Sequence, residues 1–288
     1  MAYLIHLAIL FSIYAMLGIS LNLVVGYTGL LSVAQAAFYG VGAYVTALLM
    51  VNAGFNFFLA MLVGILAGAL IAYLMGLVLS KFSGDFYALA SLGFGVIGYS
   101  VFLNWQSLTN GPLGIPGIPR PNLFGFIFSD NLSFLVLVLL ALVAVWAVAR
   151  FVVNSSFGRV LKAIREDEKA IQVFGYKTLN YKLVIFVIAA MIAAVAGSFY
   201  AAYITYIDPT TFNVFASIFV VAIIILGGLA SLRGSILGAA FLVLLPEFLR
   251  FVGFPDEIAA QMRQAVYGLL LVLLMLYRPQ GLVGEYKL

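Results

Sequence analysis

The chain alternates between long apolar stretches and short polar or glycine-rich breaks. Nine apolar runs can be recognised, at about residues 3–25, 30–50, 57–80, 86–105, 132–149, 185–206, 213–226, 235–251 and 265–277. Runs of roughly 20 apolar residues have the length of a transmembrane helix. Because some of the runs are short, the pattern predicts an all-α polytopic transmembrane helical bundle of about eight to ten spans. We expect it to form a single membrane domain over residues 1–288.

The break between the first two runs is unusual. Only Gly26-Tyr27-Thr28-Gly29 separates them, so the second hydrophobic segment follows almost without a loop. A helix break at membrane depth is tolerated only where the backbone is buried in protein or lines a cavity. Residues 26–35 are therefore candidates for a function.

Composition and charge support the membrane interpretation. Hydrophobic residues make up 65% of the chain and charged residues 8%, whereas soluble domains average about 25% charged residues. The stretch Arg150–Lys182 holds seven of the fourteen basic residues. If this loop is cytoplasmic, eleven basic residues lie inside, which predicts an outer N-terminus and a cytoplasmic C-terminus in the cell (inner) membrane.

The sequence also limits the chemistry of the chain. It contains no Cys and one His, so we expect no disulfide, no thiolate nucleophile and no metal site. It also lacks a Gly-x-x-x-x-Gly-Lys phosphate loop. We therefore expect no enzymatic activity in this chain and no power source of its own.

Within the charged loop, the pattern predicts one amphipathic helix of about 17 residues. Ser155 and Ser156 are N-cap candidates and Gly175 is a natural stop. Apolar residues recur at helical spacing on one side: Val160, Leu161, Ile164, Ile171 and Phe174. One interpretation is a surface helix that binds anionic lipid. The other, which we favour, is a coupling element that fits a groove on a cytoplasmic subunit.

The order Glu168-Lys169-Ala170 followed by Gly175 resembles the EAA loop through which ABC importer permeases contact their ATPases. This resemblance implies ATPase-coupling roles for five residues: Arg165, Glu166, Glu168, Ala170 and Gly175.

Other segments extend the resemblance over most of the chain. They are residues 21–32, 109–121, 158–167, 207–209, 227–234, 245–247 and 278–281. Together they resemble the LivM-type permease of branched-chain amino-acid ABC importers. The resemblance implies a sister permease subunit, two cytoplasmic ATPase subunits and an extracytoplasmic solute-binding protein as partners. It also implies that ATP and Mg²⁺ are used by the ATPase subunits, and that this chain holds no cofactor.

An amino-acid zwitterion that crosses a membrane needs dipoles and small polar groups along its path. A broken helix supplies free N–H and C=O groups for this purpose. We therefore predict a substrate pathway lined by Gly26, Tyr27, Thr28, Gly29, Ser32 and Gln35. The alternative is that these glycines only permit close helix contact.

Three other functions compete with the importer. The first is a urea or short-amide ABC permease, which shares much of the signature. The second is an ion-coupled secondary transporter that uses Glu247 or Asp208, and the third is a passive channel. Glu247 lies inside an apolar run, but an ion pair with Arg250 is the simpler interpretation.

Several other features have structural interpretations. We read Asp208-Pro209 as a helix terminator and His6 as a packed histidine. The Gly111–Pro121 loop is either a structural cap or a contact for the binding protein. Gly29-Leu30-Leu31-Ser32 and Gly228-Leu229-Ala230-Ser231 are candidates for corresponding points of an inverted repeat.

Overall fold

The computed structural model describes residues 2–82, 84–123, 126–251, 265–266, 268–269, 272–273, 276 and 280–284. In this part of the chain the helices are α1 (Ala2–Thr28), α2 (Gln35–Asn52), α3 (Phe57–Leu79), α4 (Asp85–Asn104), α5 (Gln106–Thr109), α6 (Asn131–Asn154), α7 (Ser156–Glu166), α8 (Glu168–Val173), α9 (Thr178–Ile204), α10 (Val214–Gly227) and α11 (Leu232–Phe251). Short 3₁₀ turns η1 (Gly111–Leu113) and η2 (Pro209–Phe212) and two-residue strands β1 (Ile115–Pro116), β2 (Asn122–Leu123), β3 (Phe126–Ile127) and β4 (Tyr206–Ile207) complete the described elements. The all-α helical bundle is confirmed.

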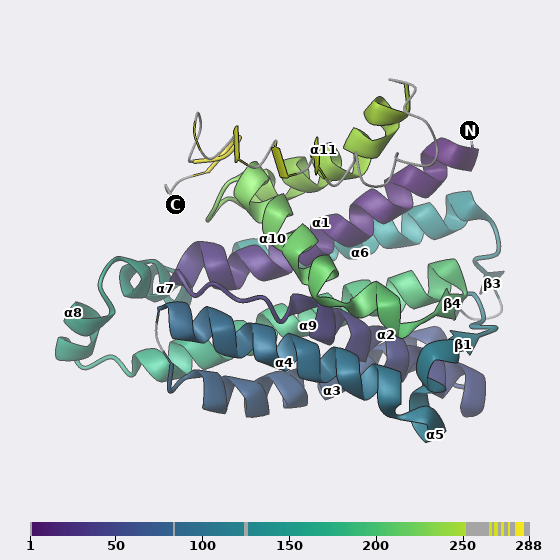
Figure 1. Cartoon of the computed structure of the whole chain (residues 1–288), viewed down its shortest axis with the longest axis horizontal. Helices are drawn as coiled ribbons and strands as arrows, with labels where there is room; N and C mark the ends of the chain where they lie inside the picture. Colours follow the sequence, from purple (N-terminus) through teal and green to yellow (C-terminus); the bar gives the residue numbers. More distant parts are fainter. Residues whose placement is uncertain are drawn as a thin grey trace.

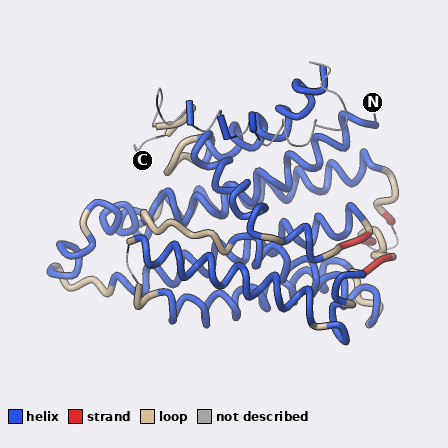
Figure 2. The backbone as a smooth tube through the Cα atoms, in the orientation of Figure 1, coloured by secondary structure: helices blue, strands red, loops and turns tan. Residues whose placement is uncertain are grey.

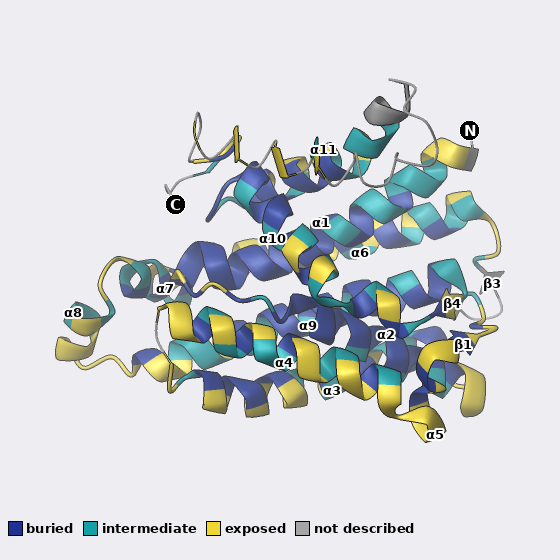
Figure 3. Ribbon diagram, in the orientation of Figure 1, coloured by how far each residue is buried: buried dark blue, intermediate teal, exposed yellow. Residues whose placement is uncertain are grey.

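Helices α1 and α9 form the centre of the bundle. More than half of the most apolar window of each is buried, 56% in α1 and 61% in α9, against 22% in α4. Helix α1 packs on α9, α6 and α11, and α2 packs on α9 and α3. Buried residues accordingly concentrate in α1, α2 and α9, while α3, α4 and α8 carry much of the exposed surface (Figures 1 and 3).

The described residues contain fewer long apolar helices than the eight to ten predicted spans. Five helices are long and apolar enough to cross a membrane: α1, α3, α4, α6 and α9. Helices α10 and α11 are bent by 118° at the short break between them. The pair adds a sixth span if it is counted as one broken span. The predicted second run became the 18-residue α2, which falls outside this group. The predicted ninth run (265–277) is described only in part.

The predicted helix break is real, but it lies further along the chain. Helix α1 continues through Gly26 and Tyr27 to Thr28, whose hydroxyl donates to the Val24 carbonyl at 2.7 Å. Gly29 then ends the helix with a φ of +74°, a conformation that favours glycine. The break is the non-helical segment 29–34, and α2 begins at Gln35 rather than near residue 30.

Helix α3 has a face of small residues that serves for packing. Its buried residues include Gly64, Gly68, Ala72 and Gly76, which follow one another at steps of four. A Cβ at Gly64 would lie 3.1 Å from Thr46 Oγ1, and one at Gly68 would lie 3.2 Å from the Ala194 Cβ. Small side chains there let α3 approach α2 and α9 closely.

The corner between α10 and α11 is held by two distant segments. Asn22 of α1 donates to the Gly228 and Ser231 carbonyls at 3.2 and 3.0 Å, and its Oδ1 accepts from Ala230 N at 2.9 Å. Residues 280–284 cover the corner from another side, because the backbone N–H groups of Leu282 and Val283 donate to the Leu226 and Gly227 carbonyls at 2.9 Å each. Backbone groups freed by the 118° bend are thus satisfied from other parts of the chain.

The two ends of the bundle differ in structure. Helices α7 and α8 extend from one end, and α5 and the strands lie at the other (Figures 1 and 2). At the strand end, β1 pairs antiparallel with β4, with Ile115 opposite Ile207. This pairing ties the loop after α4 to the loop after α9, so the predicted Gly111–Pro121 loop is packed against the bundle.

Candidate functional site

The non-helical segment 29–34 is partly buried among the helices of the bundle. Leu30, Ser32 and Ala34 are buried, and the segment is drawn as a loop among the helices in Figure 2. Serines from two other helices satisfy backbone donors here: Val33 N donates to Ser91 Oγ and Ala36 N donates to Ser217 Oγ, both at 2.9 Å. The break therefore meets the condition for irregular backbone at membrane depth.

The six predicted pathway residues come together around this break. Gly26, Tyr27 and Thr28 form the last turn of α1, Gly29 and Ser32 lie in the segment, and Gln35 begins α2. All of these except Gly29 are buried. A Cβ at Gly26 would overlap the Asn22 side chain and approach Ala230 N. Gly26 therefore permits close contact with the α10–α11 corner and does not break the helix.

Gln35 is deeply buried, with 2% of its surface exposed. Its amide Nε2 donates to Ser20 Oγ, and Ser20 Oγ donates in turn to the Ala189 carbonyl of α9. Gln35 also lines a small cavity between α1, α2, η2 and α10. The start of α2 is thus a polar point inside an apolar bundle.

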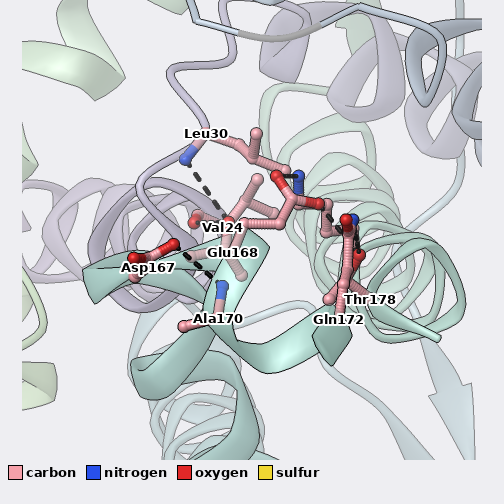
Figure 4. Close-up of polar contacts among 9 residues, drawn as sticks. Val24, Leu30, Asp167, Glu168, Ala170, Gln172 and Thr178 are labelled. Carbon is pink, nitrogen blue, oxygen red and sulfur yellow. Dashed lines mark hydrogen bonds and ion pairs between the residues drawn. The ribbon is translucent and has the colours of Figure 1, made fainter. Parts of the chain in front are cut away.

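The charged loop forms two helices, not the single 17-residue helix that we predicted. Ser155 caps α7 by accepting from Gly158 N at 3.3 Å, as expected, whereas Ser156 is the first residue inside the helix. The split occurs at Asp167, which has an extended backbone with a φ of −154°. Its carboxylate accepts from Ala170 N at 3.0 Å and so caps α8 (Figure 4). This local bond competes with continuation of α7.

Glu168 fixes α8 to the beginning of α9. Its carboxylate pairs with Lys182 Nζ at 2.5 Å and accepts from Thr178 Oγ1 at 2.9 Å. Gln172 Nε2 donates to the same Thr178 hydroxyl at 3.0 Å, so these side chains point toward one another (Figure 4). Glu168 is thus engaged within the chain and positions α8.

The end of α8 exposes two large apolar side chains. Val173 is 87% exposed and Phe174 is 77% exposed, and no residue of α8 is buried. Phe174 therefore does not share the packed face of Leu161 and Ile164 that we predicted for it. Gly175 follows with a φ of +86°, which confirms it as the helix stop.

Helix α7 connects this projection to the helix break. Arg165 Nη1 donates to the Gly26 carbonyl, and Lys162 Nζ lies 5.6 Å from the ring centroid of Tyr27. A lysine over an aromatic face is an attractive cation–π arrangement. The predicted coupling residue Arg165 therefore contacts the predicted pathway segment directly, while Glu166, one residue on, is exposed.

Other residues singled out in the sequence lie elsewhere. Glu247 accepts a hydrogen bond from the Tyr3 hydroxyl, and the side chain of Arg250, its expected partner, lies outside the described residues. Asp208 accepts from Thr211 N at 3.2 Å and so caps η2 after α9 has ended. His6 packs on Tyr203, with 2.7 Å between Nδ1 and the hydroxyl. Among the described residues, no three His, Asp or Glu side chains are grouped as metal ligands.

Three polar residues of this region had no role in the sequence-based prediction. Asn22, Ser91 and Ser217 are all buried and all bond backbone groups of the two helix breaks. Each is a single small polar residue inside an apolar run. A single polar residue in an apolar run indicates a buried hydrogen bond, but the sequence does not indicate which distant backbone group is its partner.

Comparisons with known proteins agree over nearly the whole chain. Residues 3–275 match the family described as "Branched-chain amino acid transport system / permease component". The chain is 36% identical to the permease LivM of a high-affinity branched-chain amino acid transport system of Escherichia coli, over 97% of this chain and 69% of that protein. It is 27% identical to the LivH permease of the same organism, over 95% of this chain and 92% of LivH.

A more distant relative comes from Methanocaldococcus jannaschii. It is described as a probable branched-chain amino acid transport permease LivM, is 24% identical, and is matched over 96% of this chain and 91% of its own length. No solved structure matches the chain significantly.

Proposed function

Because this chain belongs to the family of permease components of branched-chain amino acid transport systems, we propose that it is a membrane-spanning permease subunit of an ABC importer. It translocates branched-chain amino acids, and ATP hydrolysis in separate cytoplasmic subunits drives the transport. The observation that carries the proposal is the family match over residues 3–275. The five long apolar helices fit a multi-pass membrane protein.

A sister permease is the first proposed partner. The chain resembles both LivM and LivH of E. coli over at least 95% of its length. Two permease chains of the same fold can pair about a pseudo-twofold axis and enclose the substrate pathway between them. An extracytoplasmic solute-binding protein is the partner proposed for the strand end of the bundle.

Two ATPase subunits are the partners proposed for the other end. Helix α8 presents Val173 and Phe174 to the outside, 87% and 77% exposed. Exposed apolar side chains on a fixed projection suit insertion into a groove of another protein. Glu168, bonded to Lys182 and Thr178, holds the projection in place. ATP and Mg²⁺ belong to these subunits, since this sequence lacks a phosphate loop.

The contact between α7 and α1 could couple movement of the ATPase subunits to the predicted substrate pathway. A displacement of α8 by the bound ATPase would be transmitted to α7, because only Asp167 separates the two helices. Helix α7 reaches the end of α1 through Arg165 and Lys162. We propose that movement of this unit shifts Gly26 to Gly29, Ser32 and Gln35 and so alters the path of the substrate.

Uptake by the assembled transporter tests the function. The chain, its sister permease, the ATPase subunits and the binding protein are reconstituted in liposomes. We expect accumulation of radiolabelled leucine that depends on ATP and on the binding protein. Uptake driven by a proton or sodium gradient with this chain alone would favour a secondary transporter instead.

The docking role makes a separate prediction. In the double variant Val173→Asp, Phe174→Asp, two charges replace the exposed apolar pair, and we expect about tenfold less ATPase to copurify from native membranes. The control is Leu113→Asp, which changes an 80% exposed leucine near the strand end. Equal ATPase recovery from the double variant and the control would contradict the docking role of α8.

A further inference from the structure

The small cavity at the start of α2 combines polar and apolar walls. Its apolar wall comes from Leu17, Ala36, Ala216 and Val220. The larger groove between α2 and α4 differs, because its accessible lining is apolar throughout. A cavity with both kinds of surface fits a ligand that has a charged end and a branched hydrocarbon end.

The polar wall of the cavity contains an unsatisfied hydroxyl. It is formed by Tyr14, Gln35, Tyr39 and Thr211. Tyr39 is 2% exposed, and its hydroxyl has no hydrogen-bond partner in the described part of the chain. A buried hydroxyl without a partner is costly, so an unpaired one calls for an explanation. A ligand acceptor that binds during transport supplies one.

The electrostatics of the cavity favour an anionic group. Helix α2 is 18 residues long and begins at Gln35, which lines the cavity. The positive end of the helix dipole therefore lies at the cavity that Tyr39 also lines. A carboxylate there would accept from the hydroxyl and be stabilised by the helix end.

On these observations, and on the proposed function, we propose that this cavity is the closed form of a substrate site. Tyr39 donates to the carboxylate of the amino acid, and the side chain of the amino acid packs on Leu17, Ala216 and Val220. The cavity now has about 10 Å³ of space, enough for one water molecule. It opens for a branched-chain amino acid when α10 moves away from α1. Tyr14, Thr211 and Ala216 are partly exposed and mark the side on which it opens.

The chain supplies a matched control for the test. Tyr44 lies on the same helix, is also 2% exposed and also has an unpartnered hydroxyl, but it lines the apolar groove. Removal of an unsatisfied hydroxyl leaves folding intact or improves it. Both Tyr39→Phe and Tyr44→Phe should therefore fold, with unfolding midpoints in detergent no lower than that of the wild type.

The experiment measures leucine uptake by the complete reconstituted importer. We expect Tyr39→Phe to lower the rate about tenfold, since a hydrogen bond to a charged group is lost, and Tyr44→Phe to match the wild type. Equal rates for the two variants would overturn the assignment of Tyr39. Failure of the wild type to take up leucine would instead refute the proposed function.

A second measurement locates the ligand. Leucine with a photoreactive diazirine side chain is supplied to the importer, and crosslinked peptides are identified by mass spectrometry. We expect labels on the α1 and α10 residues that line the cavity, suppressed by excess leucine. Labels confined to other helices would place the substrate site elsewhere.

Discussion

Single buried polar side chains hold the irregular parts of this molecule together. Asn22 forms hydrogen bonds with the Gly228 and Ser231 carbonyls, Ala230 N and the Ser235 hydroxyl. Ser91 and Ser217 do the same for the segment that joins α1 to α2. In an apolar bundle each of these bonds replaces one that water would otherwise provide. Such residues are few, and each therefore has a large effect.

Asn22→Leu is the clearest test at this scale. It leaves several buried backbone groups unpaired, so we expect the free energy of unfolding to fall by about 2–4 kcal/mol. Denaturant unfolding of the detergent-solubilised protein measures the change. Asn104→Leu is the control, because Asn104 is exposed and, within the described part of the chain, its side chain bonds only the Ser100 carbonyl, at 2.9 Å. Comparable losses in the two variants would show that the corner does not depend on Asn22.

At the scale of elements, close helix contact depends on glycine at particular positions. A Cβ at Gly42 of α2 would overlap the backbone of Ala194 in α9, whereas a Cβ at Gly93 of α4 would meet nothing within 4 Å. Replacement of either glycine by alanine changes helix propensity equally, but only the Gly42 substitution introduces a clash. The two substitutions therefore form a matched pair.

We expect Gly42→Ala to destabilise the bundle by about 3 kcal/mol or more, because backbone must move to admit the methyl group. Gly93→Ala should be neutral or stabilising by up to about 1 kcal/mol, since alanine favours the helix. Thermal unfolding in detergent distinguishes them. If Gly42→Ala proves as stable as Gly93→Ala, α2 and α9 do not pack as closely as described.

Hydropathy predicted the helices well and their joints poorly. The limits of α3 and α4 follow the apolar runs, whereas α6 continues to Asn154, five residues beyond the predicted end at residue 149. The break after α1 lies three residues beyond the Gly26 predicted, because Gly26 accommodates Asn22 rather than a turn. The split of α7 from α8 depends on the Asp167 side chain, and the 118° bend between α10 and α11 depends on Asn22. Such tertiary bonds leave no periodic signal.

At the scale of the whole molecule, the site joins distant parts of the chain. The predicted pathway residues and Arg165 were separate hypotheses in the sequence, and the fold brings them into contact at the Gly26 carbonyl. Gln35 was predicted, whereas Tyr39 was not, because an unpaired hydroxyl is visible only once its surroundings are known. The sequence thus predicted the region but not the cavity.

The proposed partners place α8 on the cytoplasmic side of the membrane and the strand end on the outer side, and this orientation can be tested. The chain contains no cysteine, so single cysteines can be introduced at Phe174 and at Leu113, which lie near opposite ends. We expect a membrane-impermeant maleimide to label Leu113→Cys in intact cells, and Phe174→Cys only after permeabilisation. The reverse pattern would invert the proposed topology.

The backbone bonds that Leu282 and Val283 donate to the end of α10 also bear on biogenesis. Residues 280–284 are synthesised more than 50 residues after α10. The Leu226 and Gly227 carbonyls therefore lack these two donors until then. Closing contacts so distant in sequence is slow. We therefore expect the corner that receives Asn22 to be completed only once residues 280–284 have been synthesised, and a nascent chain that stalls before residue 280 to lack these two bonds.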